Sequence, residues 1–155
     1  MLCAAVVGLT EEEARWKPVS GAWSVLEVVC HITDEEVDDF GPRVFGTLDD
    51  PRSAWAPIDP EGVATSRGYN EQDLAAVLNR FEKQRDASVM RLRALSQPAW
   101  SNAYEHPQFG PIRAGDVMVS WAAHDMLHLR QISKRRFELI SRAGDGFGTA
   151  YAGDW

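Results

Sequence analysis

Apolar residues recur at steps of three and four over three long stretches of the chain, which is the period of an amphipathic helix. We expect helices over residues 24–45, 70–97 and 114–140. Ser24 is followed three residues later by Glu27, the spacing of a capping box at the start of a helix. Asn70 precedes acidic residues in the next turn and is expected to cap the second helix. Pro42 is expected to bend the first helix near its end.

The segments between these helices contain Gly, Pro and Asp without a hydrophobic period, so residues 46–69 and 99–113 are predicted to be long loops. A loop as long as the first one is uncommon in a small domain and often acts as a lid. Residues 1–8 have the pattern of a short helix that ends at Gly8, and Thr10 can cap a short acidic turn. Strand signals are scarce. The pattern predicts an all-α, up-and-down four-helix bundle with a truncated first helix.

The length of 155 residues suits one domain with a core of its own, so we assign residues 1–155 to a single helical domain. Residues 143–155 are rich in glycine and are expected to form a flexible tail. These glycines follow a helix and precede none, which is not the context of a phosphate-binding loop.

Charge and cysteine content narrow the function classes. A formal net charge of -7 repels phosphate backbones, so no nucleic-acid partner is expected. Cys3 and Cys30 lack the spacing of a zinc ribbon and are too few for a secreted disulfide scaffold. The apolar start lacks the basic residues of a signal peptide, and no apolar run is long enough to span a bilayer. These features predict a cytoplasmic protein without a membrane partner.

Two of the four histidines have a spacing that suits metal binding. His124 and His128 form H-x-x-x-H within the last long helix, so both rings point to one face about one turn apart. Together with Val117, Trp121 and Gln131 they follow steps of four and three, as residues on a packing seam do. Buried polar groups need hydrogen-bond partners or a metal ion. The pair is therefore either a chelating pair or a hydrogen-bonded pair of core residues.

His31 is the third candidate ligand. At about 100° per residue, it lies on the side of its helix that is opposite the apolar stripe. Acidic residues share this side: Glu27, Asp34, Glu35 and Asp38. Periodicity alone therefore predicts that His31 faces solvent. A functional role requires that the acidic side faces a cleft, where carboxylates would accept the second N–H of a ligand histidine or act in acid–base chemistry.

The other conspicuous residues have structural interpretations. Cys30 is predicted to be a buried thiol that points away from His31, and Trp23 and Trp121 are predicted to be core residues. His106 lies in a loop, where an accessory ligand and a surface histidine are both open interpretations. A basic group near the end of the last helix is expected to complement the negative end of the helix dipole. It comprises Arg130, Lys134, Arg135 and Arg136.

Three motifs resemble those of the DinB-like superfamily. They are W-S-V-L-E-V-V-C-H-I-T-D-E at residues 23–35, H-P-x-F-G-P at residues 106–111 and W-A-A-H-D-x-x-H-L-R-Q-I at residues 121–132. Their order and spacing cover most of the chain. The resemblance implies a four-helix bundle, commonly dimeric, in which three histidines hold a divalent metal ion in an open cleft. Carried over by position, the metal ligands are His31, His124 and His128.

The resemblance also implies a chemistry. Three neutral imidazole nitrogens leave coordination positions free, as in catalytic sites, and they suit zinc or nickel. Family members of known activity include thiol-dependent S-transferases and a thiol-dependent isomerase. We therefore expect a metal-dependent transferase or hydrolase that activates a low-molecular-weight thiol or water against a small-molecule substrate. Glu27 and Glu35 are the candidate proton acceptors.

Two hypotheses without catalysis are also open: a metal or small-molecule binding protein of a stress response, and a structural helical dimer. Relatives carry a full first helix, whereas this chain has a short one. The last helix is apolar nearly all round between Val117 and Ile132 and must be covered on every side, so we expect a homodimer.

Overall fold

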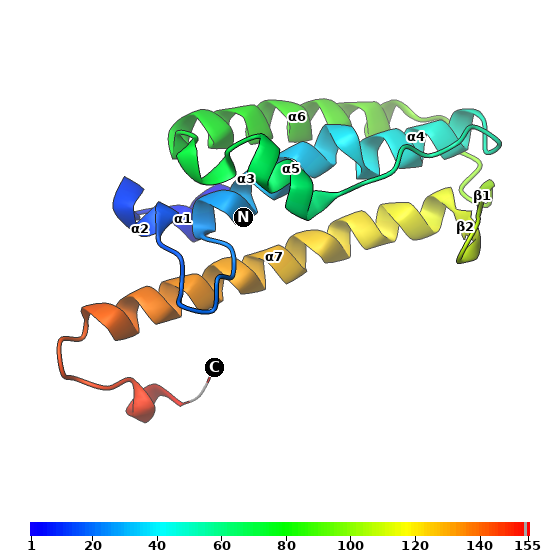
Figure 1. Cartoon of the computed structure of the whole chain (residues 1–155). Helices are drawn as coiled ribbons and strands as arrows, with labels where there is room; N and C mark the ends of the chain where they lie inside the picture. The colour runs from blue at the N-terminus through cyan, green and yellow to red at the C-terminus, as the bar shows by residue number, and fades with distance from the viewer. Residues whose placement is uncertain (154) are drawn as a thin grey trace.

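Helices form most of the computed structural model, which describes residues 1–153 and 155. Three long rods lie along one another, formed by α3 with α4, by α6 and by α7, and a small hairpin closes one end (Figure 1). The predicted all-α bundle is confirmed. Its elements are α1 (Leu2–Val6), α2 (Glu11–Arg15), α3 (Val25–Asp38), α4 (Phe40–Asp49), α5 (Pro60–Ser66), η1 (Tyr69–Glu71), α6 (Leu74–Ala94), β1 (Ala103–His106), β2 (Gly110–Arg113), α7 (Ala114–Ala143) and η2 (Ala150–Ala152).

α3 is the central helix of the bundle. Its start is fixed by the predicted capping box, in which Ser24 Oγ accepts from Glu27 N at 3.1 Å and Glu27 Oε2 accepts from Ser24 N at 2.8 Å. Its apolar side packs against α6 and α7 through Leu26, Val29, Val77, Phe81 and Ile132, among others. Each large apolar side chain buried in this way contributes about 1.5–3 kcal/mol. This packing sets the distance between α3 and α7, the two helices that carry the histidines.

The first long helix ends earlier than predicted. Instead of one helix over residues 24–45, α3 and α4 are joined at Asp39, whose φ of -127° and ψ of -85° are not helical. Pro42 lies in the first turn of α4, where it has no N–H to bond back to the preceding turn, so the chain can break ahead of it. The break turns Phe40 toward α7, where its ring stacks on Trp121 with centroids 6.0 Å apart.

The segment of residues 46–69, predicted to be a loop, contains helical structure. α4 extends into it, and α5 begins with Pro60 after the side chain of Asp59 caps its first turn. η1 starts at the end of the segment, where Tyr69 Oη donates to Asp34 Oδ2 at 2.6 Å. These elements cover the acidic side of α3, which periodicity assigned to solvent.

The second long helix begins later than predicted. Asp73 caps α6 and accepts from Ala76 N at 2.7 Å, so the prediction that Asn70 is the cap was wrong. Asn70 instead lies in η1, where its Oδ1 accepts from Ser24 Oγ at 2.6 Å and its Nδ2 donates to Arg15 O at 3.0 Å. The side chain of Asn70 therefore forms tertiary hydrogen bonds instead of capping the helix.

Residues 99–113, also predicted to be a loop, contain a β-hairpin. β1 and β2 pair antiparallel, with Ala103 opposite Arg113 and His106 opposite Gly110. Gly110 has a φ of +71°, which glycine adopts without strain and which the tight turn requires. Four residues per strand are too few for an alternating pattern to be recognised. α7 follows directly from β2, at the predicted position.

α1 fills the place of a bundle helix over only part of the bundle. Arg136 Nη1 donates to Ala5 O and Val7 O, both at 2.9 Å, and holds the end of α1 on α7. Beyond the N-terminal end of α1, a narrow groove continues between α6 and α7. It is lined by Arg85, Ser88, Val89, Leu92, Met118, Trp121, Ala122 and Asp125.

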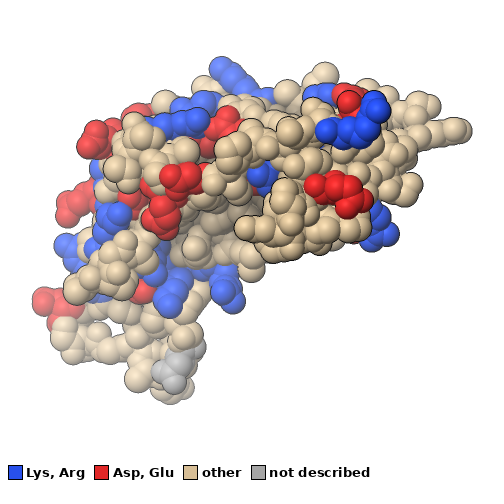
Figure 2. Space-filling view, turned by 45° about the vertical axis from the view of Figure 1, so that its right-hand side comes forward, with Lys and Arg blue, Asp and Glu red and all other residues tan. Residues whose placement is uncertain are grey.

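The surface is mixed in charge, with Lys and Arg interspersed among Asp and Glu on the face shown in Figure 2. Within the described residues, no helix combines the length and the apolar character needed to cross a membrane. Between Val117 and Ile132, three large apolar side chains of α7 are exposed, Val119 at 70%, Met126 at 46% and Leu127 at 57%. Self-association through this surface stays a prediction.

Candidate metal centre

Two helices bring three histidine rings together. His31 comes from α3, and His124 and His128 come from α7. Ring centroids are 5.3 Å apart for His31 and His124, 4.6 Å for His31 and His128, and 4.2 Å for the pair on α7. One ring nitrogen of each residue lies within 4.8 Å of the other two. No other group of three potential metal ligands lies as close in the part of the chain that the structure describes.

His31 is buried, with an exposed fraction of 5%, so the solvent-facing position predicted from periodicity was wrong. Asp34, Glu35 and Glu36, on the polar part of the same helix, are buried as well. The cause lies in the pattern itself, because an amphipathic period marks the side that faces an apolar core. It does not distinguish solvent from a cleft, since polar residues line both.

Polar side chains outside the triad lie beside two of its rings. His128 Nδ1 donates to Gln131 Oε1 at 2.6 Å, which leaves a lone pair on His128 Nε2, 2.9 Å from His124 Nε2. Glu35 Oε1 lies 3.5 Å from His31 Nδ1 and can hold the proton of that nitrogen. Partners of this kind set the tautomer of metal-binding histidines. The spacing of Gln131 was visible in the sequence, but its role as a partner was not predicted.

Burial keeps the three imidazoles neutral. Desolvation, together with repulsion from His128 and His124, lowers the pKa of His31 to about 3. Desolvation and His128 lower the pKa of His124 to about 4, and burial also lowers the pKa of His128. Neutral imidazole is the form that binds metal, so at neutral pH no proton has to be displaced from these rings.

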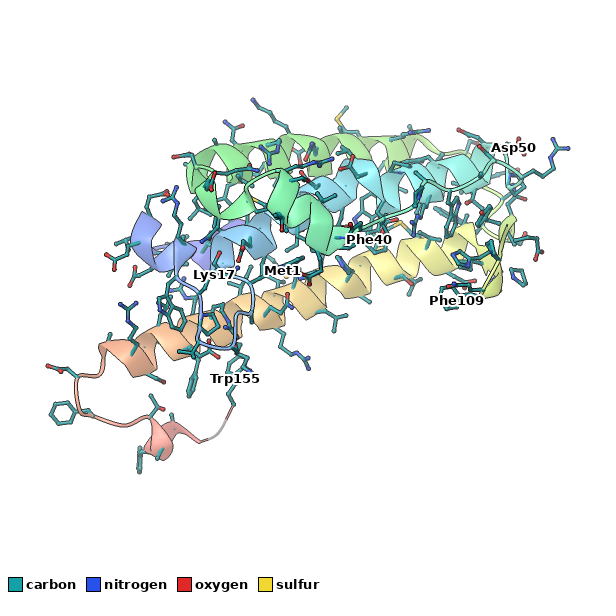
Figure 3. The ribbon with its side chains drawn as sticks, viewed as in Figure 1. Met1, Lys17, Phe40, Asp50, Phe109 and Trp155 are labelled. Atoms are coloured by element: carbon teal, nitrogen blue, oxygen red, sulfur yellow. The ribbon has the colours of Figure 1, made fainter. Side chains whose placement is uncertain are left out.

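The triad forms one wall of an open cleft of about 530 Å³. Aromatic rings flank the histidines on two sides: Trp23 lies 5.0 Å from His31, and Phe40 lies 4.9 Å from His124. Figure 3 shows Phe40 between α5 and α7. The remaining wall comes from Glu35, Asp39, Ile58, Pro60, Glu61 and Gln131. The cleft therefore opens toward the segment that ends in α5.

The carboxyl group of Glu35, which lines this cleft, has a raised pKa. Burial raises the pKa of Glu35 above its usual range, its hydrogen bond and repulsion with Asp39 raise it further, and Arg43 opposes the shift. Arg43 Nε lies 2.5 Å from Asp39 Oδ1 and balances the negative charge of Asp39, the neighbour of Glu35. A carboxyl of this kind is suited to exchanging a proton near neutral pH. Neither Asp39 nor Arg43 was singled out from the sequence.

The donor set fits a divalent transition-metal ion. Nitrogens bound to a tetrahedral zinc ion at about 2.0–2.1 Å would lie roughly 3.3 Å apart. The three ring nitrogens, all within 4.8 Å of one another, can reach this separation by small rotations of the side chains. Imidazole suits both zinc and nickel. A three-nitrogen set beside an open cleft corresponds to a site that keeps a coordination position for water or substrate.

The structure does not bring every candidate to the cleft. Glu27 does not line it, because its carboxylate caps α3 and binds Lys17 Nζ at 2.8 Å. His106 lies in the hairpin, outside the group formed by the other three histidines. Cys30 is fully buried, as predicted, and burial raises its pKa to about 12. Trp23, predicted to be a core residue, packs against the core and also lines the cleft.

Comparison with known proteins gives matches to a family model, to a curated protein and to solved structures. A family model described as the DinB superfamily matches residues 1–132. A protein of Oceanobacillus iheyensis named "Putative metal-dependent hydrolase" is 25% identical over 133 residues, which are 86% of this chain and 76% of that protein. The solved structure described as "YfiT from Bacillus subtilis is a probable metal-dependent hydrolase with an unusual four-helix bundle topology" superposes with a TM-score of 0.70 at 21% identity. It covers 87% of this chain and 79% of YfiT.

Proposed function

Because this chain belongs to the DinB superfamily and three of its neutral histidines converge beside a cleft, we propose that it is a metal-dependent hydrolase of a small molecule. His31, His124 and His128 bind the divalent metal ion. The observation that carries the proposal is the meeting of three ring nitrogens from α3 and α7 at a cleft of about 530 Å³. The relatives that are named as metal-dependent hydrolases support the choice of reaction.

A divalent ion at this position supplies Lewis-acid chemistry, because it lowers the pKa of a bound water and polarises a carbonyl or phosphoryl group. The residues of the chain prepare the site for this chemistry. Gln131 keeps the proton of His128 on Nδ1, so that Nε2 remains free to bind. Trp23 and Phe40 cover the two sides of the triad and exclude water from them.

Glu35 is the proton acceptor in this proposal. It lines the cleft, contacts His31 and has a raised pKa, whereas Glu27 is occupied by the helix cap and by Lys17. A Glu35→Gln variant should therefore keep its bound metal and lose turnover by about 100-fold or more, the usual contribution of general acid–base catalysis. Retained turnover in the metal-loaded variant would assign the acceptor to another group.

A thiol-dependent transferase is the second candidate. A free position beside three nitrogens also accepts a thiolate, and the apolar walls formed by Trp23, Phe40 and Ile58 favour an organic thiol over water alone. A metal-binding protein without turnover is the third. Hydrolysis of a panel of esters, amides and phosphoesters, each assayed with and without a low-molecular-weight thiol, separates the three.

Metal analysis of the purified protein tests the ligand set directly. We expect about one equivalent of zinc or nickel by mass spectrometry, and loss of the metal in His128→Ala with an unchanged helical circular dichroism spectrum. His106→Ala is the matched control, because this fourth histidine lies in the hairpin, and it should keep its full metal content. Full metal content in His128→Ala would refute the proposed ligands.

A further inference from the structure

The basic residues of α7 need an explanation other than the helix dipole. From the sequence they were expected to complement the negative end of the helix dipole. α7 continues to Ala143, so Arg130, Lys134 and Arg135 lie two or more turns before its end. The dipole stabilises charges only within the last turn. The explanation offered from the sequence is therefore wrong for these three residues.

These three side chains line a single pocket. It has a volume of about 740 Å³ and is formed by Arg130, Gln131, Lys134, Arg135 and Trp155. Trp155 lies beneath α7 in Figure 3, and its ring is 5.8 Å from that of Phe137. Figure 2 shows Lys and Arg side chains between the body of the molecule and the C-terminal segment.

The pocket adjoins the metal cleft through one residue. Gln131 lines both spaces, and its Oε1 is the atom that accepts the Nδ1 proton of His128. At 1.5 Å of rise per residue, Lys134 and Arg135 lie about 10 Å along α7 from His128. A small elongated molecule can therefore have one end at the triad and the other in the basic pocket.

Two of the cations that line the pocket are available to bind an anion. Within the described part of the chain, neither Arg130 nor Lys134 forms an ion pair with an acidic side chain. The side chain of Arg135 is 8% exposed and pairs with Glu138, with Nη2 donating to Oε1 at 3.2 Å. Its Nη1 lies 2.8 Å from Glu138 Oε2, so the charge of Arg135 is largely met by Glu138. Arg130 and Lys134 therefore supply the positive charge that an anion in the pocket would meet.

We propose that this pocket binds an anionic group, a carboxylate or a phosphate, of the molecule whose reactive end lies at the triad. The inference rests on the proposed function, because it defines the substrate class of the same cleft. In a chain with a net charge of -7, a pocket lined by three cations, one of which is paired with Glu138, selects for anionic over neutral or cationic molecules.

Two zinc-binding probes of equal length test the proposal on the zinc-loaded protein. Octanedioic acid monohydroxamate ends in a carboxylate, and octanoic hydroxamate ends in a methyl group. We expect calorimetry to show that the wild type prefers the carboxylate probe by about tenfold or more, since hydrogen bonds to charged groups are the stronger ones. The double variant Arg130→Gln/Lys134→Gln should lose this preference and keep its affinity for the neutral probe. The double variant Lys83→Gln/Arg93→Gln, which removes two exposed cations from α6, is the charge-matched control and should keep the preference.

Equal binding of both probes to the wild type overturns the proposal and leaves the metal site intact. If neither probe binds, the proposed metal site is refuted. The anion pocket is then tested separately on the metal-free protein. We expect saturable shifts of the backbone amide NMR signals of residues 130–135 on titration with octanedioate or inorganic phosphate, and their loss in the double variant. The titrant with the lower dissociation constant shows whether the pocket prefers a carboxylate or a phosphate. The absence of saturable shifts with both titrants overturns the proposal.

Discussion

Replacement of Arg85 by methionine should destabilise the protein strongly, because Arg85 joins three elements of the bundle. From α6, its Nε donates to Glu36 Oε1 of α3 at 2.8 Å, and its Nη1 donates to Asp125 Oδ2 of α7 at 2.6 Å. Trp121 Nε1 is a further donor to Glu36 Oε1, at 3.0 Å. Arg85→Met keeps most of the aliphatic stem and removes the guanidinium, so the variant reports mainly on the lost charge.

The size of the effect follows from the burial of the two carboxylates. The side chain of Asp125 is 19% exposed and can be hydrated, whereas that of Glu36 is 0% exposed and its Oε2 has no hydrogen-bond partner. Loss of one partner of a buried ion pair costs about 3–5 kcal/mol. With a slope of about 2 kcal/mol per molar urea, the unfolding midpoint should fall by roughly 1.5–2.5 M.

Urea unfolding followed by circular dichroism measures this loss. Arg93→Met, an exposed arginine on the same helix, is the control and should change stability by about 0.5 kcal/mol or less. Glu36→Gln in the Arg85→Met background should restore at least half of the loss, because it removes the uncompensated charge. A loss below about 1 kcal/mol in Arg85→Met, or no recovery in the double variant, would refute the reasoning.

Three further predictions concern the triad and the surface of α7. Gln131→Met should weaken metal binding by about 10–100-fold without loss of the fold, as measured by competition with a chelator, because His128 loses the acceptor of its Nδ1 proton. Since the folded pKa values of His31 and His124 lie near 3 and 4, the unfolded chain binds more protons below pH 6.5. The metal-free protein should therefore unfold at lower urea at pH 5 than at pH 6.5, a difference that shrinks in His31→Gln. We also expect a dimer by light scattering at micromolar concentration, and a shift toward monomer in Leu127→Lys, whose exposed side chain lies on the apolar surface of α7; a wild type that is already monomeric would contradict this.

Features that depend on neighbours in sequence could be predicted from the sequence. The cap at Thr10 and the capping box at Ser24 formed as expected, because each involves residues three apart and the first turn of one helix. The H-x-x-x-H spacing placed His124 and His128 on one face for the same reason. These interactions need only the local helix geometry, which a linear pattern fully specifies.

Features that depend on contacts between distant segments were decided by the tertiary structure. Asn70 does not cap α6, because its side chain forms a hydrogen bond with Ser24, which is far away in the sequence. The polar side of α3 became a cleft wall because α5 and η1 packed over it, so His31 met the histidines of α7. Arg135, which the sequence assigned to the helix dipole, is instead buried and paired with Glu138. The physical reason is common to all three: a polar residue has the same pattern in sequence whether it faces water, a cleft or a buried partner, and only the packing of distant elements selects among them.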